Sequence, residues 1–235
     1  MKDFRAIYKN FFEKRKFKTW CTELMGFYST EINNPYIVDV GCGSNKIGNS
    51  KSVVGCDMFP SSDDIIQAAA DDLPFESGSV DILFSAHCLE HMANPIKTLQ
   101  EWCRVVGDDG VIWLVLPHRN RTFDSLRDLT AVEHLFDDLA ENTPEEDMTH
   151  WEEFRAKVIL SGHRLVPSEY IMPAQENKFT YFNSKRLIHH HVWTLGTFID
   201  LVKALGLEVT YGIEQVPGRE DSFSIIFKGV MHDSI

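Results

Sequence analysis

Hydrophobic positions between residues 36 and 118 follow the pattern of strands that alternate with helices. Apolar runs of strand length occupy residues 36–41, 52–57, 64–69, 80–87 and 110–118. Residues 94–106 have helical spacing instead, with Asn94 as the cap and Pro95 in the first turn. The last run is apolar on both faces, which predicts a central strand. This alternation predicts a parallel sheet with helices on both of its sides.

The two ends of the chain add helices and a hairpin to this sheet. Aromatic and basic residues at helical spacing predict one or two helices over residues 3–30, covering part of the core. Near the other end, Thr194 is expected to cap a helix over 195–205, which Gly206 ends. The apolar runs at 207–216 and 221–229 then predict a closing antiparallel hairpin.

Residues 119–190 interrupt the alternation and are interpreted as a helical insertion. Thr130 and Glu133 predict a capping box for a helix near 131–141, and a second helix is expected from Thr143 to Gly162. We expect a single domain built from four parts. These are an N-terminal helical cover (1–34), a core (35–118), the insertion (119–190), and the last helix with its hairpin (191–235).

Composition limits the classes of partner. The 235 residues include 23 Lys and Arg against 35 Asp and Glu, a formal charge of −12, which argues against nucleic acid and anionic membrane surfaces. An anionic ligand in a local basic pocket stays compatible with this charge. No apolar run approaches the roughly 20 residues of a membrane span, so no membrane insertion is expected. Five scattered cysteines without a CxxC motif predict reduced thiols in a cytoplasmic protein. The sequence does not predict the oligomeric state.

A glycine-rich loop directly follows the first predicted strand. Gly41, Gly43 and Gly48 lie where a ligand would bind in an open α/β sheet, outside the carboxyl ends of its strands. Asp57 ends the second strand, where an acid can accept hydrogen bonds from both hydroxyls of a ribose. The glycine spacing departs from the G-x-G-x-x-G pattern of dinucleotide-binding proteins. The loop therefore predicts a nucleotide-like ligand of another class.

Five ordered motifs make the resemblance more specific. The segments "DVGCGSNKIG", "GCD", "LPF", "LEH" and "VVGDDG" occur in this order between residues 38 and 110. Together they resemble class I S-adenosylmethionine-dependent methyltransferases of the type 11 group, strongly over 36–118 and in layout only over 194–229. The resemblance implies a Rossmann-like α/β fold with a seven-stranded, mostly parallel sheet and one antiparallel strand. It also implies S-adenosyl-L-methionine as the cofactor.

The resemblance assigns roles to individual residues. Gly41 and Gly43 would let the cofactor approach the backbone, and Asp39 would accept from its ammonium group. Asp57 would bind the ribose, and Met58 would lie on the adenine. The adenine amino group is left open between Asp71, Asp72 and a backbone N–H, since relatives place an acid where this chain has Ala69. The full expected cofactor set is Asp39, Gly41, Cys42, Gly43, Asp57, Met58, Asp71, Asp72, Leu73, Ser85 and His87.

The expected reaction is methyl transfer to a small-molecule or glycan-like acceptor, at oxygen. A hydroxyl acceptor requires a general base, and histidine is suited to that role near neutral pH. His87 and His118 follow the fourth and fifth strands, and His190 belongs to an internal "HHH" segment. These three histidines are the candidate catalytic residues. The alternatives are an aminopropyl transferase and a partner subunit that binds the cofactor or has lost it.

Charge is unevenly distributed within the insertion. Residues 133–153 carry acids without Lys or Arg, whereas 177–199 carry bases without acids. Two interpretations stay open: surfaces of opposite charge that pack together, or a lid whose bases hold a phosphate or carboxylate of the acceptor. Asp147 and His150 with one of the three adjacent histidines would be a metal site. No tight ligand motif supports such a site, and we expect no metal.

Overall fold

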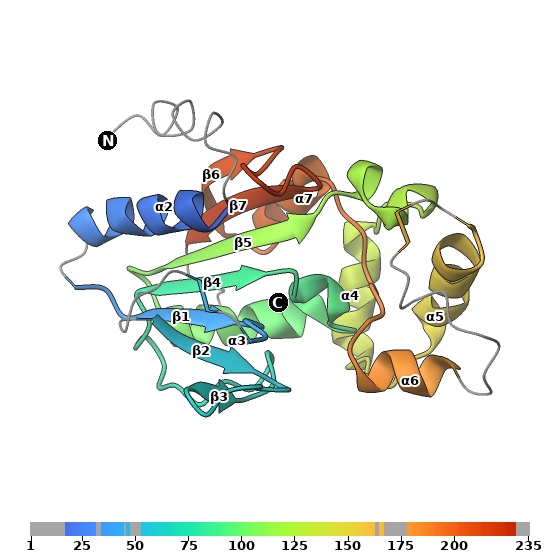
Figure 1. The fold of residues 1–235 in the computed structure, drawn as a ribbon, viewed down its shortest axis with the longest axis horizontal. Helices are drawn as coiled ribbons and strands as arrows, with labels where there is room; N and C mark the ends of the chain where they lie inside the picture. The colour runs from blue at the N-terminus through green and yellow to red at the C-terminus, as the bar shows by residue number, and fades with distance from the viewer. Residues whose placement is uncertain are drawn as a thin grey trace.

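The computed structural model describes residues 17–31, 34–44, 46–47, 53–162, 165–166 and 178–228. These residues form a seven-stranded sheet of order β3-β2-β1-β4-β5-β7-β6 (Figure 1). Strands β1 to β5 pair in parallel, and β7 is antiparallel to both β5 and β6. The predicted fold class is confirmed. The strands are β1 (Ile37–Val40), β2 (Val53–Asp57), β3 (Ile65–Gln67), β4 (Ile82–Ala86), β5 (Val111–Pro117), β6 (Glu208–Ile213) and β7 (Ser222–Lys228).

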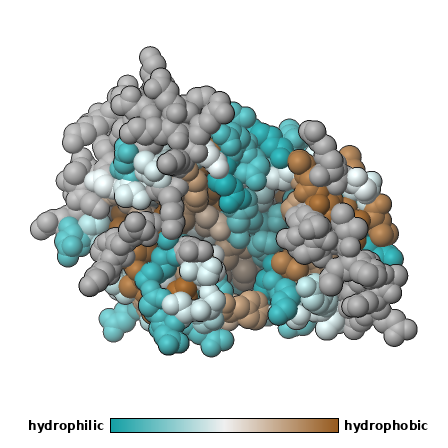
Figure 2. Space-filling view, in the orientation of Figure 1, coloured by the Kyte–Doolittle hydropathy of each residue, from teal (hydrophilic) through white to brown (hydrophobic). Residues whose placement is uncertain are grey.

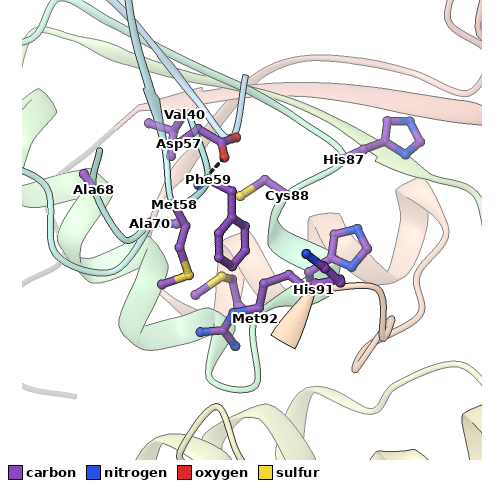
Figure 3. Close-up of a pocket in the computed structure, with 13 residues that line it drawn as sticks. Val40, Asp57, Met58, Phe59, Ala68, Ala70, His87, Cys88, His91 and Met92 are labelled. Atoms are coloured by element: carbon purple, nitrogen blue, oxygen red, sulfur yellow. Dashed lines mark hydrogen bonds between the residues drawn. The ribbon is translucent and has the colours of Figure 1, made fainter. Parts of the chain in front are cut away.

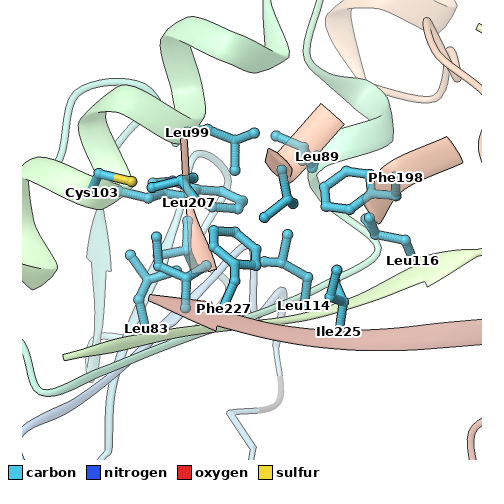
Figure 4. Close-up of a cluster of buried hydrophobic side chains, with 14 of the residues drawn as sticks. Leu83, Leu89, Leu99, Cys103, Leu114, Leu116, Phe198, Leu207, Ile225 and Phe227 are labelled. Carbon is cyan, nitrogen blue, oxygen red and sulfur yellow. The ribbon is translucent and has the colours of Figure 1, made fainter. Parts of the chain in front are cut away.

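Helices cover both faces of the sheet because the strand side chains alternate between the faces. On one face, α2 (Phe17–Glu31) places Trp20 edge-on against Trp113 of β5, with ring centroids 5.3 Å apart. On the other face, α3 (Pro95–Val106) and α7 (Leu195–Ala204) pack on the neighbouring β5 residue Leu114 (Figure 4). Every residue of β5 is buried, which confirms its predicted central position.

The insertion lies beyond the carboxyl ends of the parallel strands (Figure 1). Its elements are η2 (Arg119–Arg121), η3 (Phe123–Leu126), α4 (Val132–Glu141), α5 (Thr149–Phe154), a π-helical turn (Arg155–Ile159) and α6 (Lys178–Ser184). Leu135 of α4 joins the main core, whereas Trp151, Phe154 and Phe182 form a separate apolar cluster between α5 and α6. Figure 2, in the same orientation, shows a hollow at the centre of this face, between the strands and the insertion.

Helix caps inside the insertion differ from the prediction. The capping box at Thr130 is wrong, because α4 begins after Ala131 without a side-chain cap and Thr130 Oγ1 instead accepts from Val192 N at 2.9 Å. The helix expected from Thr143 begins only at Thr149, since Thr143 Oγ1 donates to Asp138 Oδ1 at 3.1 Å. In both cases another partner competes for the hydroxyl, 62 residues away for Thr130 and five residues away for Thr143.

The caps outside the insertion are confirmed. Asn94 Oδ1 accepts from Lys97 N at 3.1 Å at the start of α3. Thr194 and Thr197 form a capping box at the start of α7. The N-terminal helix is confirmed over Phe17–Glu31, and the remainder of its predicted range lies outside the described residues.

Candidate functional site

A cavity of about 210 Å³ lies at the carboxyl ends of β1, β2 and β4. In Figure 3, Met58 and Phe59 face Met92 across it, with Cys88 and His91 on the far wall. Its lining consists of Val40, Gly41, Asp57, Met58, Phe59, Ala68, Ala70, His87, Cys88, His91, Met92, Lys185 and Arg186. The cavity therefore lies where the fold class predicts a nucleotide-like ligand.

The glycine loop forms one wall of this first cavity. Gly41 has φ +73°, and a Cβ built on it would lie 2.7 Å from both Cβ and Sγ of Cys88, so only glycine fits. Gly41 N and Cys42 N donate to Cys56 O at 2.8 and 3.3 Å, and this folds the loop over the end of β2. Gly43 also has a positive φ, with open space where its Cβ would be.

Asp57 is held firmly at the edge of the first cavity. Its Oδ2 accepts from Gly43 N and its Oδ1 from Phe59 N, both at 2.8 Å, and Figure 3 shows the second of these bonds. A carboxylate offers about four lone-pair directions, so two remain for ligand hydroxyls. The side chain is thus positioned as a ribose ligand would be, and that assignment stays a prediction.

Asp39 lies behind the glycine loop and outside the cavity lining. Its side chain is 3 % exposed, and Oδ2 accepts from Ile47 N at 2.6 Å. Burial raises its pKa to about 7, opposed by the Ile47 hydrogen bond and assisted by the negative charge of Asp57. In this structure the Asp39 carboxylate therefore stabilises the loop through its hydrogen bond with Ile47 N.

Four more residues of the expected cofactor set lie outside the lining of the first cavity. Ser85 is buried and donates to Val40 O at 2.9 Å, while Leu73 is buried in the main core. Asp71 forms an ion pair with Lys97 at 3.0 Å, and Asp72 lines a neighbouring cavity together with Met58. Of the expected set, the first cavity brings together Gly41, Asp57, Met58 and His87.

A second cavity of about 400 Å³ adjoins the first and shares His87, His91 and Arg186 with it. Its remaining lining consists of Pro117, Arg121, Thr122, Phe123, Leu165, Leu187, His189, Arg219 and Asp221. Three of the lining residues are arginines and one is an acid. Each arginine also pairs with a carboxylate: Arg121 with Glu214, Arg186 with Glu145 and Arg219 with Asp221. Sequence reasoning missed this convergence, because the arginines come from separate parts of the chain.

His87 lies between the two cavities in an unusual backbone conformation, with φ +55°. Its Nε2 lies 2.7 Å from a terminal nitrogen of Arg219 and 2.9 Å from Ser222 Oγ. Because a guanidinium can only donate, Nε2 must accept, which places the ring proton on Nδ1. Nδ1 in turn lies 3.3 Å from Glu90 Oε1.

Glu90 is a buried acid beside His87 that the sequence reasoning did not single out. It is fully buried, and neither carboxylate oxygen has a well-aligned hydrogen-bond donor among the described residues. Burial raises its pKa, but the nearby imidazoles of His87, His91 and His189 outweigh that effect and lower it. The sequence shows Glu90 within the "LEH" motif, but only the folded structure shows that its carboxylate lies near His87.

The other two candidate bases lie outside both cavities. His118 is buried, with Nε2 3.3 Å from Glu214 Oε2, and its Nδ1 accepts from Asn120 N. His190 is 2 % exposed, its backbone N donates to Glu90 O, and burial lowers its pKa well below the usual value. The catalytic roles of His118 and His190 stay predictions.

Two groups of side chains in the described residues have the arrangement of metal ligands. One comprises Glu90, His91 and His189 beside the second cavity. The other comprises His134, Asp138, His150 and His191. Asp147, a ligand in the metal alternative considered from the sequence, belongs to neither group, because its carboxylate accepts from Thr149 N and Oγ1.

The comparisons with known proteins agree with this geometry. A family model described as a methyltransferase domain matches residues 38–114. This match confirms, for the matched segment, the resemblance to methyltransferases that its motifs carry. The uncharacterized protein YafS of Escherichia coli (strain K12) is 32% identical over 122 residues, 51% of this chain and 47% of that protein. The chain thus spans about half the length of the curated relative it matches.

Solved structures of similar proteins were also found. A methyltransferase from Mesorhizobium loti has 17% identity and a TM-score of 0.47, covering 85% of this chain and 93% of that one. A putative methyltransferase from Listeria monocytogenes has 16% identity and a TM-score of 0.46, covering 83% and 90%. Separately, none of the helices in the described residues is long and apolar enough to cross a membrane.

Proposed function

We propose that the protein transfers a methyl group from S-adenosylmethionine to a hydroxyl oxygen of an anionic small molecule. The observation that carries this proposal is the pair of adjoining cavities that share His87, His91 and Arg186. The first fits the cofactor, since Gly41 lines it without a side chain and Asp57 retains free lone pairs. The second fits the acceptor.

The chemistry needs alignment and the removal of one proton. When bound, S-adenosylmethionine supplies a methyl group on a sulfonium, whose leaving group is a neutral thioether. His87 Nε2 would take the proton of the acceptor hydroxyl. That hydroxyl would then lie where the Arg219 guanidinium lies in this structure. Glu90 holds the Nδ1 proton and stabilises the imidazolium that forms, as the carboxylate of a catalytic triad does.

Arginine chemistry narrows the acceptor class. Arg121 and Arg219 line the second cavity, and guanidinium groups bind phosphate or carboxylate with paired hydrogen bonds. A polyamine would be repelled there, which disfavours the aminopropyl alternative. A glycan acceptor fits if it carries an anionic group. We further propose that the chain is one domain and acts in the cytoplasm, where its five free cysteines would stay reduced.

Calorimetric titration with S-adenosylhomocysteine tests the cofactor site. Asp57→Ala should weaken binding by about 1.5–3 kcal/mol, the range for a hydrogen bond to a charged group. Asp128→Ala is the matched control, since its exposed carboxylate pairs with Lys157 outside the cavity lining. Absence of binding by the wild-type protein would reject the enzymatic proposal and favour the partner-subunit alternative.

Turnover tests the acceptor side separately. Release of S-adenosylhomocysteine should be screened with phosphorylated and carboxylated alcohols. His87→Gln should retain cofactor affinity and lose methyl transfer, because the amide cannot take the proton. Full activity of this variant would remove His87 as the base.

A further inference from the structure

Four side chains from the insertion and the segment after it converge on one point. His134 and Asp138 lie one helical turn apart on α4, His150 lies on α5, and His191 lies in the extended segment before α7. Figure 1 shows that segment running alongside α4, and the ring centroids of His134 and His191 lie 5.8 Å apart. One ligand atom from each of the four residues lies within 4.8 Å of all the others.

Three of the six separations are close to the edges of a metal tetrahedron, and the others are at most 4.8 Å. His134 Nε2 lies 3.1 Å from His150 Nε2 and 3.5 Å from Asp138 Oδ2. Asp138 Oδ2 lies 3.0 Å from His191 Nε2. Zinc–nitrogen bonds of 2.0–2.1 Å in tetrahedral geometry imply ligand–ligand edges of roughly 3.3 Å. A single ion could therefore contact all four ligand atoms if the side chains moved by at most about an ångström.

The tautomer of His191 points to a cation. Its Nδ1 lies 3.2 Å from Met92 O, and a carbonyl only accepts, so Nδ1 carries the proton. In the neutral ring, Nε2 then presents a lone pair to Asp138 Oδ2, also an acceptor, at 3.0 Å. Something positive must lie between the two atoms: a proton or a metal ion.

The surrounding contacts are those that support metal ligands. A ligating histidine usually donates its other ring N–H to a carbonyl, as His191 does to Met92. The second carboxylate oxygen of Asp138, Oδ1, accepts from Thr143 Oγ1. Asp138 and His191 are buried, His150 is nearly so, and the half-exposed His134 leaves a path for an ion to enter.

We propose that His134, Asp138, His150 and His191 bind one divalent transition-metal ion of the Zn²⁺ class. Three imidazoles and one carboxylate favour Zn²⁺, Co²⁺ or Ni²⁺ over Mg²⁺ and Ca²⁺, which prefer oxygen ligands. Four protein ligands close the coordination shell, as in structural sites. None of the four lines the first or the second cavity, so the ion would not touch the acceptor there.

The ion would fix the insertion to the core beside the cofactor cavity. Asn94 at the start of α3 donates to Asp138 O at 2.9 Å, and Met92, the carbonyl partner of His191, lines the first cavity. A metal would therefore connect α4 and α5 to the loop that forms one cavity wall. The site does not depend on the proposed reaction, and its test needs no substrate.

The test measures metal directly, using the full chain purified without a histidine tag. Elemental analysis after dialysis should find about one zinc per chain, and titration of apoprotein with Zn²⁺ should saturate at one equivalent. Apoprotein loaded with Co²⁺ should show the intense visible absorption of tetrahedral cobalt. His134→Gln, the least buried of the four changes, should weaken Zn²⁺ binding in chelator competition by more than about tenfold.

Two control variants make the result decisive. His118→Gln removes a buried histidine outside the group and should leave Zn²⁺ affinity unchanged. His189→Gln removes a ligand of the other group, Glu90, His91 and His189, and should also leave it unchanged. Failure of wild-type apoprotein to bind Zn²⁺ would overturn the proposal and leave a hydrogen-bonded cluster. Binding lost in His189→Gln but kept in His134→Gln would equally overturn it.

Discussion

The sheet and the insertion are stabilised in opposite ways. The main core on the sheet is built almost entirely from aliphatic and aromatic side chains, such as Leu83, Leu114 and Phe227 (Figure 4). The insertion has a small apolar cluster and contributes Leu135 to the main core, but the attachment of its segments to one another runs through buried charges and imidazoles. Asp124 and Arg127 are 1 % exposed, and His191 is similarly buried.

Arg127 shows how the polar attachment works. Its guanidinium pairs with Asp124 and Glu153 and donates to His189 O at 2.7 Å and to His190 O at 3.1 Å. Apolar packing tolerates many arrangements of similar volume, whereas a buried charge tolerates only those that satisfy its partners. The comparison suggests that the sheet supplies stability and the insertion supplies a specific shape for the acceptor side.

The largest expected effect is on the insertion. Arg127→Met should reduce the free energy of unfolding by about 3–5 kcal/mol, because it leaves Asp124 buried with only His189, 2.6 Å away, as its partner and removes the donor of two buried carbonyls. Urea denaturation measures the change, and limited proteolysis should cut first within residues 119–162. Lys157→Met is the matched control: its partners Asp128 and Glu153 are exposed or partly so, and a loss below about 1 kcal/mol is expected. Equal losses of stability in the two variants would contradict the view that buried charges distinguish the insertion from the sheet.

Asp39 is the exception within the sheet, and its effect depends on pH. Its folded-state pKa of about 7 lies above the unfolded value of 3.8, so the folded state binds more protons between these values. The resulting stability is present below pH 4 and is lost as the pH rises through 7. The amide of Asp39→Asn does not titrate, so this variant lacks the loss of stability that the wild type shows between pH 4 and 7. The difference in free energy of unfolding between the variant and the wild type should therefore increase across this pH range by up to about 4 kcal/mol. Urea midpoints from pH 4 to 8 measure the difference, and parallel curves would reject the raised pKa.

An apolar deletion in the sheet should act without any pH dependence of its own. Leu114→Ala should lower the free energy of unfolding by about 3 kcal/mol, through lost burial and the cavity it leaves. The same denaturation experiment measures it, and the change should be equal at pH 5 and pH 8. Ile66→Ala on the edge strand β3 removes a partly exposed side chain and should cost less than about 0.5 kcal/mol. A pH-dependent loss in Leu114→Ala would show that the two regions are coupled.

Sequence reasoning succeeded where local signals decide the structure. The alternating strands, the cap at Asn94 and the glycine loop next to Asp57 are all encoded within a few residues of one another. Periodicity and short motifs are sufficient for such features. The positive φ of Gly41, which brings the loop against Cys88, was likewise implied by the glycine itself.

The insertion was predicted less well because its determinants are distant in sequence. Thr130 has the local pattern of a helix cap, yet its hydroxyl accepts from Val192 N instead. Glu90 and His87 are three residues apart, but the partner that defines the His87 tautomer is Arg219. No periodic signal marks such pairs, so the second cavity and the four-residue ligand group appear only in the folded chain.

The smallest expected effect separates a true cap from an apparent one. Thr194→Ala should cost about 1 kcal/mol and speed amide exchange in the first turn of α7, because Thr194 Oγ1 accepts from Thr197 N. Thr130→Ala should leave exchange in α4 unchanged and speed it at Val192, whose N–H the hydroxyl accepts. Hydrogen exchange followed by mass spectrometry resolves both segments. Faster exchange in α4 after Thr130→Ala would restore the local cap there and weaken the view that distant partners shape the insertion.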